Sequence, residues 1–247
     1  MGYPPSQVSN TDLPPTTESA QFAGNKFKSL NIPLLTEIVL VTIVTILAIR
    51  FFGNGFLFTD AWFVAPGILI AAAIIPTAIK KRKFAEIGFN IKQTRNSLVV
   101  LGWTCMVVFP AAFLGCWLLK SYGLNLPLRP MLPQGQNMVG WLFYQFMYVA
   151  VAEEIFFRGY VQSNILRLMS TAKLEQYGLR QLISITLSAI CFTAAHIIVQ
   201  GHMISVLVFL PGLILGWLFI RTKSLLAPIL FHGLANTCYF FMTAAFA

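Results

Sequence analysis

Long apolar runs, separated by short polar segments, fill the chain after its first 30 residues. Each run is about 20 residues long, which is the length an α-helix needs to cross the hydrocarbon core of a bilayer. Backbone polar groups in lipid must be satisfied within the segment, so continuous runs of this length predict helices and not the alternating strands of a barrel. The pattern predicts seven spans, at about residues 33–52, 61–79, 97–119, 138–160, 181–199, 204–220 and 225–246.

The composition excludes a water-soluble globule. Of the 247 residues, 57% are hydrophobic and only 10% are charged, whereas soluble domains carry about 25% charged residues. We therefore expect an all-α, polytopic transmembrane helix bundle that forms a single domain over residues 31–247. Residues 1–30 are polar and rich in Pro, Ser and Thr, which predicts a disordered cytoplasmic tail.

The net charge of +9 favours a membrane surface over nucleic acid as the partner of the basic residues. Most of these residues lie between the apolar runs and outside any nucleic-acid-binding motif, so we expect no nucleic-acid partner. If Lys26 and Lys28 are cytoplasmic, 13 of the 17 basic residues are cytoplasmic. This asymmetry predicts an integral, multi-pass protein with a cytoplasmic N-terminus, and we expect a bacterial plasma membrane. The mixed polar and apolar residues 161–180 predict an interfacial helix and loop.

The fourth apolar run contains two adjacent acids, Glu153 and Glu154, followed by Arg158. Ionisable groups inside a membrane are costly and usually functional. Glu154 and Arg158 are four residues apart and share a helix face, so they can pair. Glu153 is rotated by about 100° from Glu154 and is left without a partner on its own helix, as a general base would be. The alternative is that both acids pair with Arg158 as a packing device.

Two later runs carry further polar side chains at helical spacing: Phe192 and His196 in the fifth, and His232 and Asn236 in the seventh. A shared cavity inside the seven-span bundle explains them better than three unrelated occurrences. With straight helices along the membrane normal, Glu153 and His232 lie about 8 and 10 Å from the cytoplasmic boundary. His196 lies about 22 Å from it, unless the fifth helix begins in the cytoplasm or tilts strongly, so straight helices do not bring it to the other two.

Three motifs follow one another in the core of residues 138–246: Glu-Glu-x-x-x-Arg (Glu153, Glu154, Arg158), Phe-x-x-x-His (Phe192, His196) and His-x-x-x-Asn (His232, Asn236). In this order they resemble the motif set of the CAAX prenyl protease and bacteriocin-processing (CPBP, or ABI) family of intramembrane glutamate proteases. The resemblance implies a helix bundle around a conical cavity.

The resemblance also implies a role for each motif residue. Glu153 would activate a water molecule together with His196, and His232 with Asn236 would stabilise the oxyanion. The supporting positions, which would hold the site together, are Glu154, Arg158 and Phe192. The implied activity is metal-independent hydrolysis of a peptide bond in a peptide or lipid-modified protein tail, without a cofactor.

Three other functions are compatible with parts of this pattern. A zinc protease could use Glu153, His196 and His232 as ligands, although the chain has no HExxH motif. A non-catalytic scaffold or bacteriocin-immunity protein of the same family would keep the cavity only for binding. A proton-coupled transporter would also carry Glu and His at mid-depth, but it predicts an inverted repeat that the sequence lacks. The substrate and the oligomeric state do not follow from the sequence.

Overall fold

A computed structural model of the chain describes residues 31–52, 63–90, 93–124, 128, 137–171 and 176–246. These residues form helices and connecting segments and contain no strand, which confirms the all-α prediction. The predicted tail, residues 1–30, lies outside the described residues. The helices, including short 3-10 and π segments labelled η, are α1 Ile32–Phe52, α2 Val64–Ile79, η2 Phe84–Ile87, α3 Thr94–Ser121, α4 Met138–Tyr144, η4 Gln145–Ala150, α5 Val151–Glu154, η5 Ile155–Gln162, α6 Ser163–Thr171, α7 Tyr177–Gln200, η6 Met203–Val208, α8 Phe209–Thr222 and α9 Leu226–Phe246.

Each of the seven predicted apolar runs is helical in the structure. Within the described ranges, five helical segments are long and apolar enough to cross a membrane: α1, α3, α7, η6 with α8, and α9. The helix α2 is apolar but has only 16 residues. The remaining run belongs to a helix that is continuous from Met138 to Thr171 and includes two π-helical segments, η4 and η5.

The predicted end of this helix at residue 160 is wrong. The helix continues to Thr171, and the segment predicted as a separate interfacial helix is its last part together with the start of α7 at Tyr177. Its 34 residues are about 50 Å long at 1.5 Å per residue, against a hydrocarbon core of about 30 Å. It therefore tilts or extends beyond the membrane, and a limit of about 20 residues could not predict its end.

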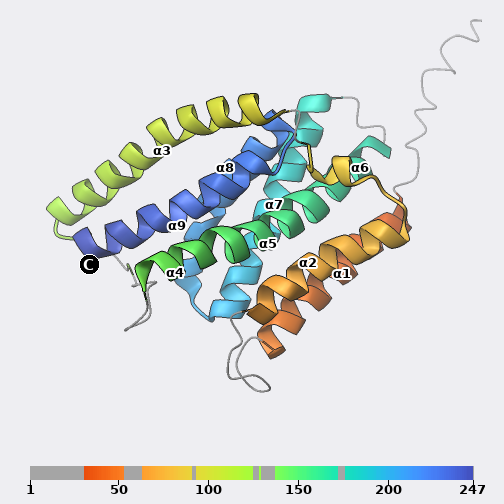
Figure 1. The fold of residues 1–247 in the computed structure, drawn as a ribbon, viewed down its shortest axis with the longest axis horizontal. Coiled ribbons are helices and arrows are strands. Elements are labelled where there is room, and N and C mark those ends of the chain that lie inside the picture. Colours follow the sequence, from red (N-terminus) through yellow and green to blue (C-terminus); the bar gives the residue numbers. More distant parts are fainter. Residues whose placement is uncertain are drawn as a thin grey trace, which may run out of the picture.

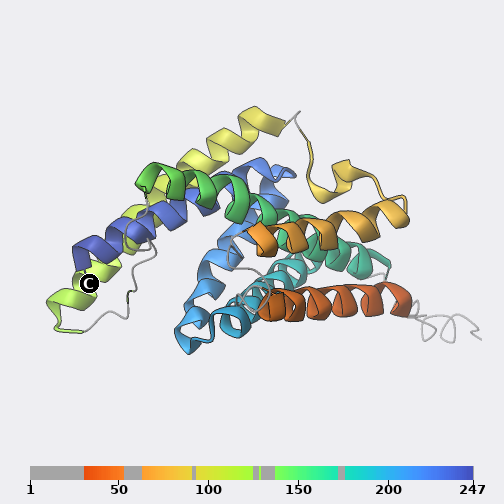
Figure 2. The same ribbon diagram turned by 60° about the horizontal axis from the view of Figure 1, so that its bottom comes forward.

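The helix from Met138 to Thr171 is the centre of the bundle (Figure 1). Every residue from Ile155 to Gln162 is buried, because α2, α7 and α8 all pack against this part of the helix. By contrast, α3 runs alongside α9 in both views (Figure 2) and leaves large apolar side chains exposed, among them Trp103 and Met106. A lipid-facing helix has this property.

A cluster of polar side chains ties α1 and the segment after α2 to the central helix. Arg82 forms two hydrogen bonds of 2.8 Å with the carboxylate of Glu37 in α1. The Tyr160 hydroxyl donates to Glu37 Oε1 at 3.0 Å, and Arg82 donates to Asn164 Oδ1 at 3.0 Å. Bidentate arginine–carboxylate pairs fix geometry as well as charge. This cluster therefore fixes the position of the central helix relative to α1 near Tyr160 and Asn164.

Candidate active site

Three helices bring Glu153, His196 and His232 to one point. Oε2 of Glu153, on α5, lies 3.8 Å from Nε2 of His196, on α7. The same oxygen lies 3.7 Å from Nε2 of His232, on α9. The side chains of Glu153 and His196 keep 18% and 17% of their surface exposed, while Oε2 of Glu153, at this glutamate–histidine corner, is buried and has no hydrogen-bond partner among the described residues.

The other ring nitrogen of each histidine is held by an acceptor. His196 Nδ1 lies 2.9 Å from the carbonyl oxygen of Phe192, one turn earlier in α7. His232 Nδ1 lies 2.8 Å from Oε1 of Glu154. A carbonyl and a carboxylate can only accept, so both Nδ1 atoms carry hydrogen and both Nε2 atoms face Glu153. The rings are thus fixed in tautomer and orientation before any ligand arrives.

Glu154 and Arg158 form a fully buried ion pair, as the sequence predicted. Arg158 Nη1 lies 2.9 Å from Glu154 Oε1, and neither side chain is exposed. Arg158 also donates to the carbonyl oxygen of Gly212 in α8 at 3.3 Å. Its guanidinium lies 4.4 Å from the ring centre of Phe192 in α7. One arginine therefore contacts two neighbouring helices as well as its own.

Phe192 connects the ion pair to the two histidines. Its ring lies edge-on to those of His196 and His232, with ring centres 4.4 and 5.9 Å apart. It is 2% exposed. Phe192 thus packs against Arg158, His196 and His232.

The amide of Asn236 is held by a residue that the sequence did not single out. Asn236 Nδ2 donates to Oε1 of Gln145 at 2.8 Å, and Gln145 lies in η4, where it is buried. Asn236 is one helical turn after His232 in α9. Since an amide NH₂ group has two hydrogens, one remains for a ligand.

Two glycines allow the helices to approach closely enough to form the site. A Cβ added at Gly233, beside His232, would lie 2.4 Å from the ring of Phe146 in η4. A Cβ at Gly212 would lie 3.3 Å from Cβ of Ala189 and 3.4 Å from the ring of Phe192. The first position has no room for a side chain, and the second has little.

The position of His196 corrects the depth estimate made from the sequence. That estimate placed the histidine more than 10 Å away from Glu153 along the membrane normal, whereas the two side chains are 3.8 Å apart. The estimate assumed straight, parallel helices starting at the ends of the apolar runs. In the structure α7 begins at Tyr177, four residues before the predicted 181, and neighbouring helices such as α8 and α9 cross at a steep angle (Figure 2).

The spacing of the three ligand-type side chains does not match a shared metal ion. Tetrahedral ligands at 2.0–2.1 Å from zinc would be about 3.3 Å apart, while the observed distances to Glu153 are 3.7 and 3.8 Å. Among the described residues, no group of three His, Cys, Asp or Glu side chains has an arrangement suited to a metal ion. Separations of 3.7 and 3.8 Å are short enough for one water molecule to hydrogen-bond both atoms of either pair.

Comparison with known proteins gives one match. Residues 135–238 match the family model described as type II CAAX prenyl endopeptidase Rce1-like. Neither the curated proteins nor the solved structures gave a match to the chain. The matched segment contains the whole candidate site, from Gln145 to Asn236. Together with the long apolar helices, the match indicates an integral membrane protein whose residues 135–238 are similar to the Rce1-like family of CAAX prenyl endopeptidases.

Proposed function

We propose that the chain is an intramembrane endopeptidase in which Glu153 activates water without a metal ion. The observation that carries the proposal is the glutamate–histidine corner: one carboxylate oxygen faces two imidazole Nε2 atoms at 3.7 and 3.8 Å. Each imidazole is fixed from behind by an acceptor. A base with an unpartnered oxygen and two rings held in place around it are the parts that hydrolysis by water requires.

The two histidines have different surroundings and therefore different roles in the proposal. His196 faces one carboxylate, and its Nδ1 hydrogen is bound to a neutral carbonyl. In the proposal its Nε2 accepts a hydrogen bond from the water. His232 lies between Glu154 and Glu153, at 2.8 and 3.7 Å. We assign His232 the role of donor through Nε2, because Glu154 holds its ring beside the reacting carboxylate.

The water molecule donates one hydrogen to Glu153 Oε2 and the other to His196 Nε2. Its oxygen attacks the carbonyl carbon of the scissile peptide bond while Glu153 takes up the proton. The negative charge that develops on the substrate oxygen is stabilised by His232 Nε2–H and by the second amide hydrogen of Asn236. Glu153 then gives its proton to the leaving nitrogen as the carbon–nitrogen bond breaks, which yields a carboxylic acid and an amine; the acid then transfers its proton to the amine, giving a carboxylate and an ammonium group.

Gln145 is a positioning residue in this scheme. Its carbonyl oxygen fixes the Asn236 amide at 2.8 Å and so decides where the free amide hydrogen points. Gln145→Leu should lower kcat and leave KM nearly unchanged, because the amide loses its orientation while the substrate contacts remain. Gln145→Glu keeps an acceptor at the same place and should retain most of the activity. An equal loss in both variants would contradict the positioning role.

We propose a peptide or a lipid-modified protein tail as the substrate, in agreement with the name of the matched family. The chain reconstituted in vesicles should cleave a quenched fluorescent peptide that ends in a prenylated CAAX tail. Cleavage should be insensitive to chelators and absent in Glu153→Gln. Glu86→Gln, which changes an exposed carboxylate outside the site, is the matched control and should cleave normally.

A second readout separates a wrong substrate from a wrong activity. Membrane-associated peptides from cells carrying the wild-type chain are compared with those from cells carrying Glu153→Gln. Peptides that change only with Glu153→Gln would identify another substrate. If neither the prenylated peptide nor any cellular peptide depends on Glu153, the chain is a non-catalytic member of its family.

A further inference from the structure

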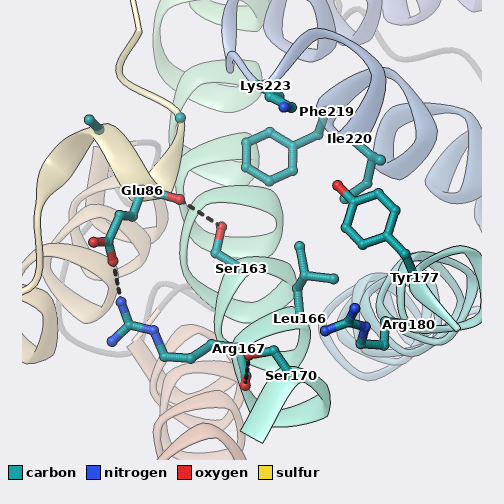
Figure 3. A pocket seen from close by; sticks show the side chains of 12 residues that line it. Glu86, Ser163, Leu166, Arg167, Ser170, Tyr177, Arg180, Phe219, Ile220 and Lys223 are labelled. Carbon is teal, nitrogen blue, oxygen red and sulfur yellow. Dashed lines mark hydrogen bonds and ion pairs between the residues drawn. The ribbon is translucent and has the colours of Figure 1, made fainter. Parts of the chain in front are cut away.

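A groove of about 490 Å³ lies away from the glutamate–histidine corner, between η2, α6, α7 and α8 (Figure 3). It is lined by Tyr177 and Arg180 at the start of α7 and by Ile220 and Lys223 at the end of α8. Both helices belong to candidate membrane spans, so the groove lies at a boundary of the membrane. Ser163, which also lines it, is ten residues after Glu153, or about 15 Å along the helix.

The groove combines an apolar floor with a cationic rim. Leu166, Phe219 and Ile220 supply the apolar part, and three cations, Arg167, Arg180 and Lys223, line the rest together with a single carboxylate, Glu86. Glu86 is paired with Arg167 (Figure 3). The positive charges of Arg180 and Lys223 are therefore not balanced by the lining of the groove.

Arg180 is held ready to bind an acceptor. Its guanidinium lies 5.6 Å from the ring centre of Tyr177, and Figure 3 shows it directed across the groove toward Leu166. Its Nε atom is buried and has no hydrogen-bond partner among the described residues. Because Nε is buried, a ligand in the groove would be bound by the terminal nitrogens of the guanidinium.

We propose that this groove binds the phosphate of an anionic phospholipid. Arginine presents its donors in a fork that matches phosphate oxygens, and lysine adds a point charge. The apolar floor formed by Leu166 and Phe219 can pack against the start of an acyl chain. A soluble phosphate has no apolar group to make this contact. Basic pockets between membrane helices are sites for anionic head groups, and tyrosine is enriched at this depth.

The test measures lipid binding to the full chain in detergent by native mass spectrometry. Phosphatidylglycerol and phosphatidylcholine with the same acyl chains are the two probes, and glycerol phosphate is a competitor that has the phosphate but no acyl chains. The variants are Arg180→Gln, Lys223→Gln and the two combined. Arg221→Gln is the matched control, because Arg221 is an exposed cation in the same turn of α8 that does not line the groove.

We expect phosphatidylglycerol to bind more tightly than phosphatidylcholine. Each variant should weaken it about fivefold and the combination about 30-fold, as expected for removal of one or two cations near a membrane surface. Arg221→Gln should stay within about twofold of the wild type. Each variant must show the wild-type circular dichroism spectrum, and if Arg180→Gln fails to fold, Lys223→Gln decides the result alone.

Three results would overturn the proposal. Equal binding of the two lipids would remove the requirement for negative charge. Equal behaviour of the combined variant and Arg221→Gln would place any lipid binding outside the groove. Displacement of phosphatidylglycerol by an equal concentration of glycerol phosphate would assign the groove to a soluble phosphate compound.

Discussion

Replacing Glu154 by glutamine should damage both the stability and the activity of the protein. Oε1 of Glu154 accepts from Arg158 at 2.9 Å and from His232 at 2.8 Å, and the Glu154 and Arg158 side chains are completely buried. Glutamine has nearly the same shape but no charge. It leaves Arg158 as a buried cation without a charged partner on its own helix, held only by neutral acceptors such as the Gly212 carbonyl and by the Phe192 ring.

The expected loss of stability is large. Breaking a buried ion pair by removing one partner destabilises a protein by about 3–5 kcal/mol. In a chain of this size, about 1 kcal/mol corresponds to about 2–4 °C, so the unfolding temperature should fall by about 6–20 °C. The matched control is Glu86→Gln, which breaks an ion pair with Arg167 whose side chains are 39% and 46% exposed. It should shift the unfolding temperature by less than about 4 °C.

A second substitution separates the two effects of Glu154. Arg158→Met in the Glu154→Gln background removes the stranded cation and should restore most of the lost stability. Cleavage should remain at least about 100-fold below wild type, because His232 Nδ1 still lacks a carboxylate. Unfolding is followed by circular dichroism of the full chain in detergent, and cleavage with the prenylated peptide at equal concentrations of folded protein.

Either of two results would refute this reasoning. A Glu154→Gln variant that unfolds within the range of the Glu86→Gln control would mean that the buried pair does not stabilise the bundle. A double variant that recovers cleavage together with stability would mean that Glu154 acts only through Arg158 and does not position His232.

Three further predictions concern the glutamate–histidine corner and the residues next to it on α9. Glu153→Gln and His196→Ala should unfold like the wild type and lose cleavage by about 10²- to 10⁴-fold; turnover near the wild-type rate in either would contradict the assignment. Asn236→Ala should lower kcat by about 10²- to 10³-fold with little change in KM, and a change confined to KM would assign Asn236 to substrate binding. Gly233→Ala should lower both stability, by about 1–3 kcal/mol, and cleavage, since its Cβ would lie 2.4 Å from the ring of Phe146. Adding Phe146→Leu should restore part of both, and a Gly233→Ala variant with normal stability and cleavage would show that the close approach is not needed.

The sequence was sufficient to predict the helices because one strong physical rule governs the backbone of a membrane span. Backbone groups in lipid must be paired within the segment, so the apolar runs alone predicted helices, and each run is helical in the structure. The ends of the helices were harder to predict. The central helix remains helical through Arg167 and on to Thr171, where the sequence turns polar, because helix formation does not stop at the membrane boundary.

The motif residues were predictable, whereas their contacts were only partly so. The pair of Glu154 and Arg158 follows from a spacing of four residues on one helix, and the structure contains it. The bond between His232 and Glu154 joins residues 78 positions apart, and the one between Asn236 and Gln145 joins residues 91 positions apart. Such contacts depend on how helices cross, which hydropathy does not encode. A buried glutamine in an apolar run was the available signal for Gln145.

The two adjacent glutamates show how a step of one residue along a helix can place the same side chain in two different environments. Glu154 points into the bundle, where it is fully buried and bound to Arg158 and His232. Glu153, rotated by about 100°, keeps 18% of its side chain exposed and has both histidines within 3.8 Å. Oε1 of Glu154 is committed to Arg158 and His232, so this carboxylate can position both groups. Oε2 of Glu153 has no hydrogen-bond partner among the described residues, so it is the oxygen left for the proposed water. The helix thus separates the positioning acid from the proposed reacting acid by one residue, and exchanging their surroundings, not their chemistry, would exchange their roles.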